Sequence, residues 1–179
     1  MILVLCGTHH QPFDRLVAAA AALAEAGEDV VVQGGPSSVP TPGAPRLDVV
    51  APEELAALAD RAEAIVAHAG PGSLFLAWDR GRLPVVWPRD PALGEHVDDH
   101  QLRYAATLGE RAIVVHDAEG LRRALIAVRG VVDPSRVPDP ARGSAFLAAF
   151  AALVDALVRP GPRRRLRLLR ALLRRTPRA

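Results

Sequence analysis

A chain of 179 residues is long enough to bury the core of one domain. Half of its residues are hydrophobic, which excludes a disordered protein, and no run of about 18 apolar residues predicts a membrane-spanning helix. The N-terminus lacks the features of a signal peptide, and the single Cys6 cannot form an internal disulfide. We therefore expect a protein of the reducing cytoplasm.

The charges are unevenly distributed along the chain. All 22 basic residues are arginines; nine of them lie in residues 159–179, where there is no acidic residue. Residues 1–158 hold the other 13 arginines against 20 acidic residues. A slightly acidic domain with a basic tail indicates one contact surface for an anionic partner and argues against a nucleic-acid-binding domain.

Strands and helices are expected to alternate over residues 1–130, and the strands are short, continuous apolar runs. In chain order we expect strand 2–6, helix 12–26, strand 30–32, strand 47–50, helix 52–60, strand 64–67, helix 72–80, strand 84–87, helix 97–108, strand 112–115 and helix 118–128. This alternation is typical of βαβ units. The sequence therefore predicts an α/β fold with a Rossmann-like parallel sheet and helices on both faces.

The pattern changes after Gly130. Three prolines within 133–140 predict an extended connector, and an apolar stripe predicts a helix over 146–158. After a Pro-Gly-Pro break, residues 163–175 predict a helix with leucines on one side and most arginines on the other. This tail is either a solvated basic segment or a basic amphipathic helix that lies on an anionic membrane or docks on a partner. The expected parts of the chain are 1–130, 131–158 and 159–179.

A histidine–glycine turn follows the expected strand 64–67: His68-Ala69-Gly70-Pro71-Gly72-Ser73. Backbone amides at a helix N-terminus bind phosphate, glycines let the backbone approach closely, and His68 adds a donor beside them. The turn predicts a phosphate site, although an ordinary strand-to-helix turn also favours Gly and Ser. It is neither a P-loop, since Lys is missing, nor a G-x-G-x-x-G motif.

Another polar segment follows the expected strand 84–87: Glu95-His96-Val97-Asp98-Asp99-His100-Gln101. Its side chains and amides suit the hydroxyl groups of a sugar or a ribose, and a solvated charged turn is the simpler alternative. His96 and His100 lie four residues apart on the face of the expected helix with Asp99 nearby, which is the spacing of two metal ligands. No third ligand is fixed by the spacing, so we expect no metal ion.

A further polar loop, Gly7-Thr8-His9, follows the first expected strand. His9 or His10 is either catalytic or a polar surface residue, and we assign no role to His116. Loops at the carboxyl ends of parallel strands share one edge of the sheet, so we expect the three loops to converge on one crevice.

In chain order, the first segment is residues 7–16, the second is 68–73 and the third is 94–101, and together they carry a family resemblance. The stretch from Gly7 to Leu16 (GTHHQPFDRL) resembles the start of the soluble subunits of two-part bacterial polysaccharide glycosyltransferases. Residues 68–73 and 94–101 resemble two further blocks of that family. The chain is also similar to the C-terminal domain of family 28 glycosyltransferases and to the catalytic subunit of the eukaryotic N-acetylglucosaminyltransferase that extends dolichol-linked GlcNAc. The resemblance covers about residues 1–130.

The resemblance implies the nucleotide-sugar half of a GT-B enzyme, in which two Rossmann-like domains face each other across a cleft. It implies that the UDP-sugar diphosphate binds at Gly7, Thr8, His68, Gly70, Gly72 and Ser73. It also implies that the sugar or ribose is contacted by Glu95, Asp99, His100 and Gln101, that catalysis needs no metal or other cofactor, and that the departing UDP is stabilised by helix-dipole and N–H donors. His9 is the candidate catalytic residue.

Two features depart from the family pattern. Many GT-B relatives place a ribose-binding Glu eight residues after the turn histidine, where this chain has Leu76. A chain of this length also has no room for an acceptor-binding half, which the family supplies as a separate membrane-anchored protein. Helix 146–158 and the tail are the candidates for docking on that partner, at the inner face of the plasma membrane.

The predicted function is a hexosyltransferase subunit that binds a UDP-sugar and, with its membrane-anchored partner, transfers the sugar to a lipid-linked acceptor in bacterial exopolysaccharide biosynthesis. Two alternatives remain open: a non-catalytic, regulatory subunit that binds a nucleotide sugar, and another Rossmann-type enzyme, such as a sugar epimerase or an NAD enzyme.

Overall fold

The computed structural model describes residues 1–136, 148–152 and 154. The elements of the first stretch are β1 (Ile2–Leu5), α1 (Asp14–Glu25), β2 (Val30–Gln33), β3 (Arg46–Leu47), α2 (Pro52–Arg61), β4 (Ala64–Ala67), α3 (Pro71–Trp78), β5 (Val85–Val86), η1 (Pro91–Leu93), α4 (His100–Ala106), η2 (Gly109–Arg111), β6 (Ile113–Val114), α5 (Ala118–Val128) and η3 (Pro134–Arg136). The predicted alternation of strands and helices is confirmed, and β4 and α5 have the predicted bounds.

The six strands form one parallel sheet in the order β3-β2-β1-β4-β5-β6. β1 lies at the centre, with Leu5 in register with Gln33 of β2 on one side and with Ala67 of β4 on the other. The chain winds outward in one direction from β1 to β3 and in the opposite direction from β4 to β6. This is the doubly wound, Rossmann-like order, so the predicted fold class is confirmed.

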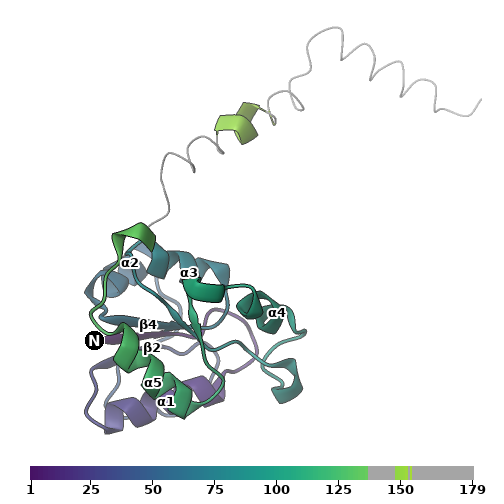
Figure 1. The fold of residues 1–179 in the computed structure, drawn as a ribbon. Helices are drawn as coiled ribbons and strands as arrows, with labels where there is room; N and C mark the ends of the chain where they lie inside the picture. The colour runs from purple at the N-terminus through teal and green to yellow at the C-terminus, as the bar shows by residue number, and fades with distance from the viewer. Residues whose placement is uncertain (137–147, 153, 155–179) are drawn as a thin grey trace, which may run out of the picture. The chain divides into compact units, whose positions relative to one another are not determined.

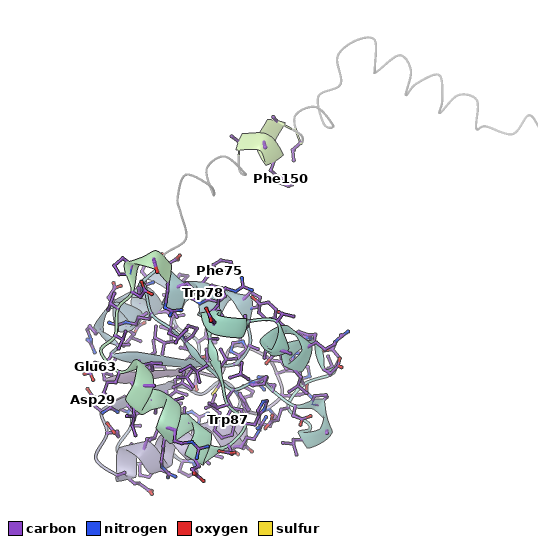
Figure 2. All side chains as sticks on the ribbon, in the orientation of Figure 1. Asp29, Glu63, Phe75, Trp78, Trp87 and Phe150 are labelled. Carbon is purple, nitrogen blue, oxygen red and sulfur yellow. The ribbon has the colours of Figure 1, made fainter. Side chains whose placement is uncertain are left out.

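Helices cover both faces of the sheet, which explains why its strands are apolar on both sides. α1 and α5 pack on one face over Ile2 and Val4, whereas α2, α3 and α4 pack on the other over Leu3 and Leu5 (Figure 1). The two tryptophans belong to opposite layers: Trp87 packs with α1 and α5, and Trp78 packs in the α3 layer, where its ring meets Phe75 edge-on (Figure 2).

Two expected elements were placed wrongly. The helix expected from residue 97 begins only at His100, because the Asp98 side chain accepts a hydrogen bond from the His100 amide at 3.1 Å and holds the preceding residues in a bend. The strand expected at 47–50 is Arg46–Leu47, because β2 ends at Gln33 and leaves residues beyond Leu47 without a partner strand.

The first compact unit comprises Met1–Val137. The amide of Gly130 donates to the Glu63 carbonyl, and the Asp133 amide donates to the Gly81 carbonyl at 2.8 Å. Pro134–Arg136 forms a turn of 3-10 helix where an extended connector was expected.

In the second unit, residues 148–152 and 154 are helical, within the helix expected over 146–158. The remainder of that helix and the basic tail 159–179 lie outside the described residues. Within the described residues, no helix has both the length and the hydropathy needed to cross a bilayer.

Candidate functional site

The site is built where the winding of the sheet reverses, between the carboxyl ends of β1 and β4. The first of these strands runs into Gly7 and the second into His68. The two loops are joined directly, since the His68 amide donates to the Leu5 carbonyl at 3.0 Å. In open α/β sheets a crevice forms at this reversal, and ligands bind there.

The His68 ring lies between two glycines. Gly7 has a φ of +76°, and a Cβ placed there would lie 2.5 Å from His68 Cε1. A Cβ on Gly70 would collide with His68 Nε2. Both glycines are therefore required by the ring, which links the first and second sequence segments in one packing unit.

Substituting Gly70 with alanine tests this packing. We expect a loss of about 1–3 kcal/mol in the free energy of unfolding, because the new methyl group overlaps the imidazole. The matched control is Gly72→Ala: a Cβ at Gly72 meets nothing within 4 Å and the residue lies in the first turn of α3, so the change is expected to be neutral or slightly stabilising. Urea denaturation measures both. In a His68→Ala background the cost of Gly70→Ala should largely disappear; an unchanged cost would contradict the ring packing.

The His68 imidazole is neutral in the free protein. Burial lowers its pKa to about 4; the hydrogen bond to Leu5 opposes the shift, and the positive charge of Arg89 adds to it. Nδ1 lies 3.2 Å from the Leu5 carbonyl oxygen, which can only accept, so Nδ1 carries the proton. Nε2 is left with a free lone pair at the glycine side of the ring.

The lowered pKa makes folding stability depend on pH. An unfolded chain protonates His68 near pH 6.5, whereas the folded chain does so only near pH 4, so protons favour the unfolded state between these values. The stabilising contribution is complete above pH 6.5 and falls as the pH drops toward 4, by about 2–3 kcal/mol. Urea denaturation of the wild type and of His68→Gln at pH 7 and pH 4.5 measures this, because other titrating groups are common to both proteins. Equal losses in the two proteins would show that His68 is not the group responsible.

Gln33, at the end of β2, holds the Gly7 loop in place. Its side-chain oxygen accepts from the Gly7 amide at 2.9 Å, and its side-chain nitrogen donates to the carbonyls of Gly7 and Asp48. Sequence reasoning assigned no role to Gln33. The sequence feature that could have indicated this role is a polar residue at the carboxyl end of a buried strand, because that end lies at the same edge of the sheet as Gly7.

The turn after His68 presents the N-terminus of α3. Gly70 is the N-cap, Pro71 is the first helical residue, and no side chain of the described residues caps this end. The amides of Ser73 and Leu74 bond to the Gly70 carbonyl, and Pro71 has no N–H, so Gly72 supplies the backbone donor of the first turn. The positive end of the helix dipole reinforces this donor.

These loops surround a cavity of about 440 Å³, a size typical of small-molecule sites. Its lining consists of Leu5, Gly7, Thr8, Gln33, Val50, Pro52, Leu55, His68, Gly70, Pro71, Gly72, Ser73 and Leu76. All six residues predicted to hold a diphosphate are among them. Leu76 and residues from the start of α2 make one side of the cavity apolar.

The third predicted segment is arranged differently. Within the described part of the chain, no residue of 95–101 lines this cavity. The Glu95 side chain is buried, and its two oxygens accept from Arg15 at 2.6 and 2.8 Å. Gln101 is also buried, and its oxygen accepts from the Arg89 amide. Glu95 and Gln101 therefore stabilise the loops here, and their predicted contacts with a sugar stay predictions.

Asp99 and His100, the other two predicted sugar contacts, are exposed at the start of α4. Asp99 pairs with Arg103 one turn later, at 3.0 Å, and His100 Nδ1 lies 2.5 Å from Asp98 Oδ1. His9, the predicted catalytic residue, bonds Gln11 at 2.8 Å and stacks on His96, with ring centroids 4.1 Å apart. Roles for these three in catalysis or sugar binding stay predictions.

Arg89 ties the first and third segments together, and sequence reasoning missed it. Its side chain is fully buried, and its guanidinium donates to four backbone carbonyls at 2.8–3.2 Å: those of Cys6, Gln11, Pro12 and Glu95. Gln11 adds a bond from its side chain to the Gly94 carbonyl. The first and third segments thus contact each other, and the first also contacts the histidine–glycine turn.

No protein-family model matches the sequence, and no curated protein matches it. Among solved structures, the chain is similar to the glycotransferase of kitacinnamycin, with 20% identity and a TM-score of 0.43 over 79% of this chain and 36% of the other. It is similar to the glycosyltransferase SnogD from Streptomyces nogalater, with 26% identity and a TM-score of 0.45 over 84% and 44%. It is also similar to the solution structure of ALG13, with 17% identity and a TM-score of 0.49 over 73% and 89%. The chain spans less than half the length of the first two proteins.

Proposed function

We propose that this chain is the donor-binding subunit of a two-part glycosyltransferase, equivalent to the C-terminal half of a GT-B enzyme. In this proposal it binds a UDP-sugar and, with a membrane-anchored partner that holds a lipid-linked acceptor, transfers the hexosyl group in polysaccharide biosynthesis. The observation that carries the proposal is the position of His68, between Gly7 and Gly70 at the reversal of the sheet and on the wall of the cavity.

The geometry of the cavity suits a diphosphate. Gly72 offers its amide at the N-terminus of α3, and Thr8 and Ser73 add hydroxyl groups to the lining. As the bond from the sugar to the diphosphate breaks, negative charge grows on the departing UDP. Fixed donors at a helix N-terminus stabilise that charge without needing to reorganise.

His68 binds the ligand through Nε2 in this proposal, because Nδ1 already donates to Leu5. A neutral Nε2 accepts a hydrogen bond from a ligand hydroxyl, whereas beside a phosphate oxygen it must first gain a proton. The negative charge of a diphosphate favours that proton and raises the pKa of His68 in the complex.

The apolar residues of the lining, among them Leu55 and Leu76, suit the face of a flat ring, and the uracil base offers such a face. Because Leu76 carries no hydrogen-bonding group, the ribose takes its contacts from other residues. Docking of residues 146–179 on the partner or on an anionic membrane belongs to the same proposal and rests on their sequence.

A thermal-shift panel tests donor binding. The full chain is expected to be stabilised by UDP-sugars more than by GDP- or dTDP-sugars at equal concentration, and not by NAD. Stabilisation by NAD alone would contradict the proposal and favour another Rossmann-type enzyme.

Turnover is tested separately, with the chain co-expressed with a membrane protein encoded beside it. The proposal expects release of UDP in the presence of a lipid-linked acceptor. UDP-sugar binding with no turnover by the assembled pair would instead identify a regulatory subunit.

A further inference from the structure

Three side chains that follow η1 bring their metal-binding atoms together, outside the lining of the cavity. They are His96, Asp98 and His100, and one ligand atom from each lies within 4.8 Å of the others. His96 Nδ1 is 3.5 Å from Asp98 Oδ1, and His100 Nδ1 is 2.5 Å from the same oxygen. The bend before α4 produces this convergence, which the helix expected from the sequence would not.

Neighbouring rings hold the cluster in position. His9 stacks on His96 with an interplanar angle of 17°, and His100 meets His96 edge-on with ring centroids 4.4 Å apart. His96 is buried, whereas the side chains of Asp98 and His100 are about half exposed. An ion from solvent can therefore reach the three donors, and at His96 Nδ1 it would replace the hydrogen bond that the Asp98 amide donates at 3.4 Å.

The donors select a class of ion. Two imidazoles with one carboxylate are the ligands of Zn²⁺ in open, three-residue sites, whereas Mg²⁺ and Ca²⁺ prefer oxygen ligands alone. Tetrahedral coordination at about 2.1 Å places ligand atoms about 3.4 Å apart. The distances of His96 Nδ1 and His100 Nδ1 from Asp98 Oδ1, 3.5 and 2.5 Å, lie on either side of that value.

We propose that His96, Asp98 and His100 bind one divalent transition-metal ion of the zinc class, with a fourth position open to water. Such an ion would fasten the bend before α4 and, through the His96–His9 stack, the loop that begins at Gly7. The proposal is independent of the proposed glycosyltransferase function, because its test needs neither nucleotide nor acceptor.

The test uses the tag-free full chain, freed of metal with EDTA and then of EDTA by gel filtration. Calorimetry with Zn²⁺ should show one equivalent bound, and Co²⁺ should give the intense visible absorption of a tetrahedral site that Zn²⁺ displaces. An excess of Mg²⁺ should not compete.

His100→Ala and Asp98→Asn should each weaken Zn²⁺ binding at least about tenfold. Both residues are exposed, and an asparagine in place of Asp98 would keep the acceptor for the His100 amide, so neither change threatens folding. The controls are His10→Ala and His116→Ala, which should bind as the wild type does. Absence of saturable binding up to about 1 mM Zn²⁺, or equal affinity in the wild type and both ligand variants, would overturn the proposal.

Discussion

Replacing Arg89 with methionine is expected to lower the free energy of unfolding by about 3–5 kcal/mol, the largest effect on stability that we anticipate for one side chain. The guanidinium is fully buried and serves four backbone carbonyls, among them those of Cys6 and Glu95. Methionine fills much of the volume but donates nothing. Each buried acceptor left without a partner costs about 1–3 kcal/mol, so repacking by methionine cannot compensate for their loss.

The matched control is Arg103→Met. Arg103 is exposed and, among residues 1–136, pairs with Asp99 one turn away, an arrangement worth about 0.5 kcal/mol or less. Urea denaturation near neutral pH measures both variants. A loss of less than about 1 kcal/mol in Arg89→Met would mean that the first and third segments keep their positions without the arginine.

Removal of the His68 imidazole is expected to have the largest effect on ligand binding. We expect His68→Ala to bind UDP-glucose about 10- to 100-fold more weakly, since a hydrogen bond to a charged group contributes about 1.5–3 kcal/mol. His116→Ala is the control, because His116 follows β6 and is not in the lining of the cavity. Isothermal titration calorimetry measures the affinities; equal affinities in all three proteins would contradict a role for His68 in binding.

The pH dependence of the affinity for UDP-glucose tests whether His68 gains a proton when the ligand binds. The pKa of His68 is about 4 in the free protein, and a bound diphosphate raises it, so the complex takes up a proton between the two values. Affinity should therefore fall as the pH rises from 4 to the pKa of the complex and then level off. Each phosphate of UDP-glucose carries one ester bond and one anhydride bond, and its remaining acidic group stays ionised throughout this range. In His68→Ala this component of the pH dependence should be absent; an identical profile in both proteins would exclude proton uptake by His68.

Local patterns in the sequence were sufficient to predict most of the fold. β4 was placed correctly because its short apolar run is typical of a buried strand, and α5 because its apolar residues repeat at the 3.6-residue period of a helix. The start of α4 was placed wrongly because Asp98 favours its own bond to the backbone over helix, and a helix-period pattern does not reveal that choice.

The positions of the predicted site residues could be inferred from the sequence only where the backbone determines them. Gly7, His68 and Gly70 follow strand ends, and strand order brings strand ends together. Glu95 and Gln101 also follow a strand end, yet their side chains turn inward to Arg15 and Arg89. The first of these contacts joins residues 80 positions apart, which spacing cannot show.

The burial of Arg89 also could not be predicted from the local sequence. An arginine between Pro88 and Asp90 has the appearance of a surface loop residue. Its burial arises because the surrounding loops fold over it and present their carbonyls, and no short motif encodes such a cage.

Backbone-amide NMR of the full chain titrated with UDP tests the central claim most directly, because it reports on each loop of the sheet edge separately. If the diphosphate binds at the reversal of the sheet, the amides of Gly7, Thr8, Gly70, Gly72 and Ser73 should shift together and saturate with one dissociation constant, while those of β3 and α5 remain unchanged. Saturable shifts confined to other loops, or none at all, would contradict the account.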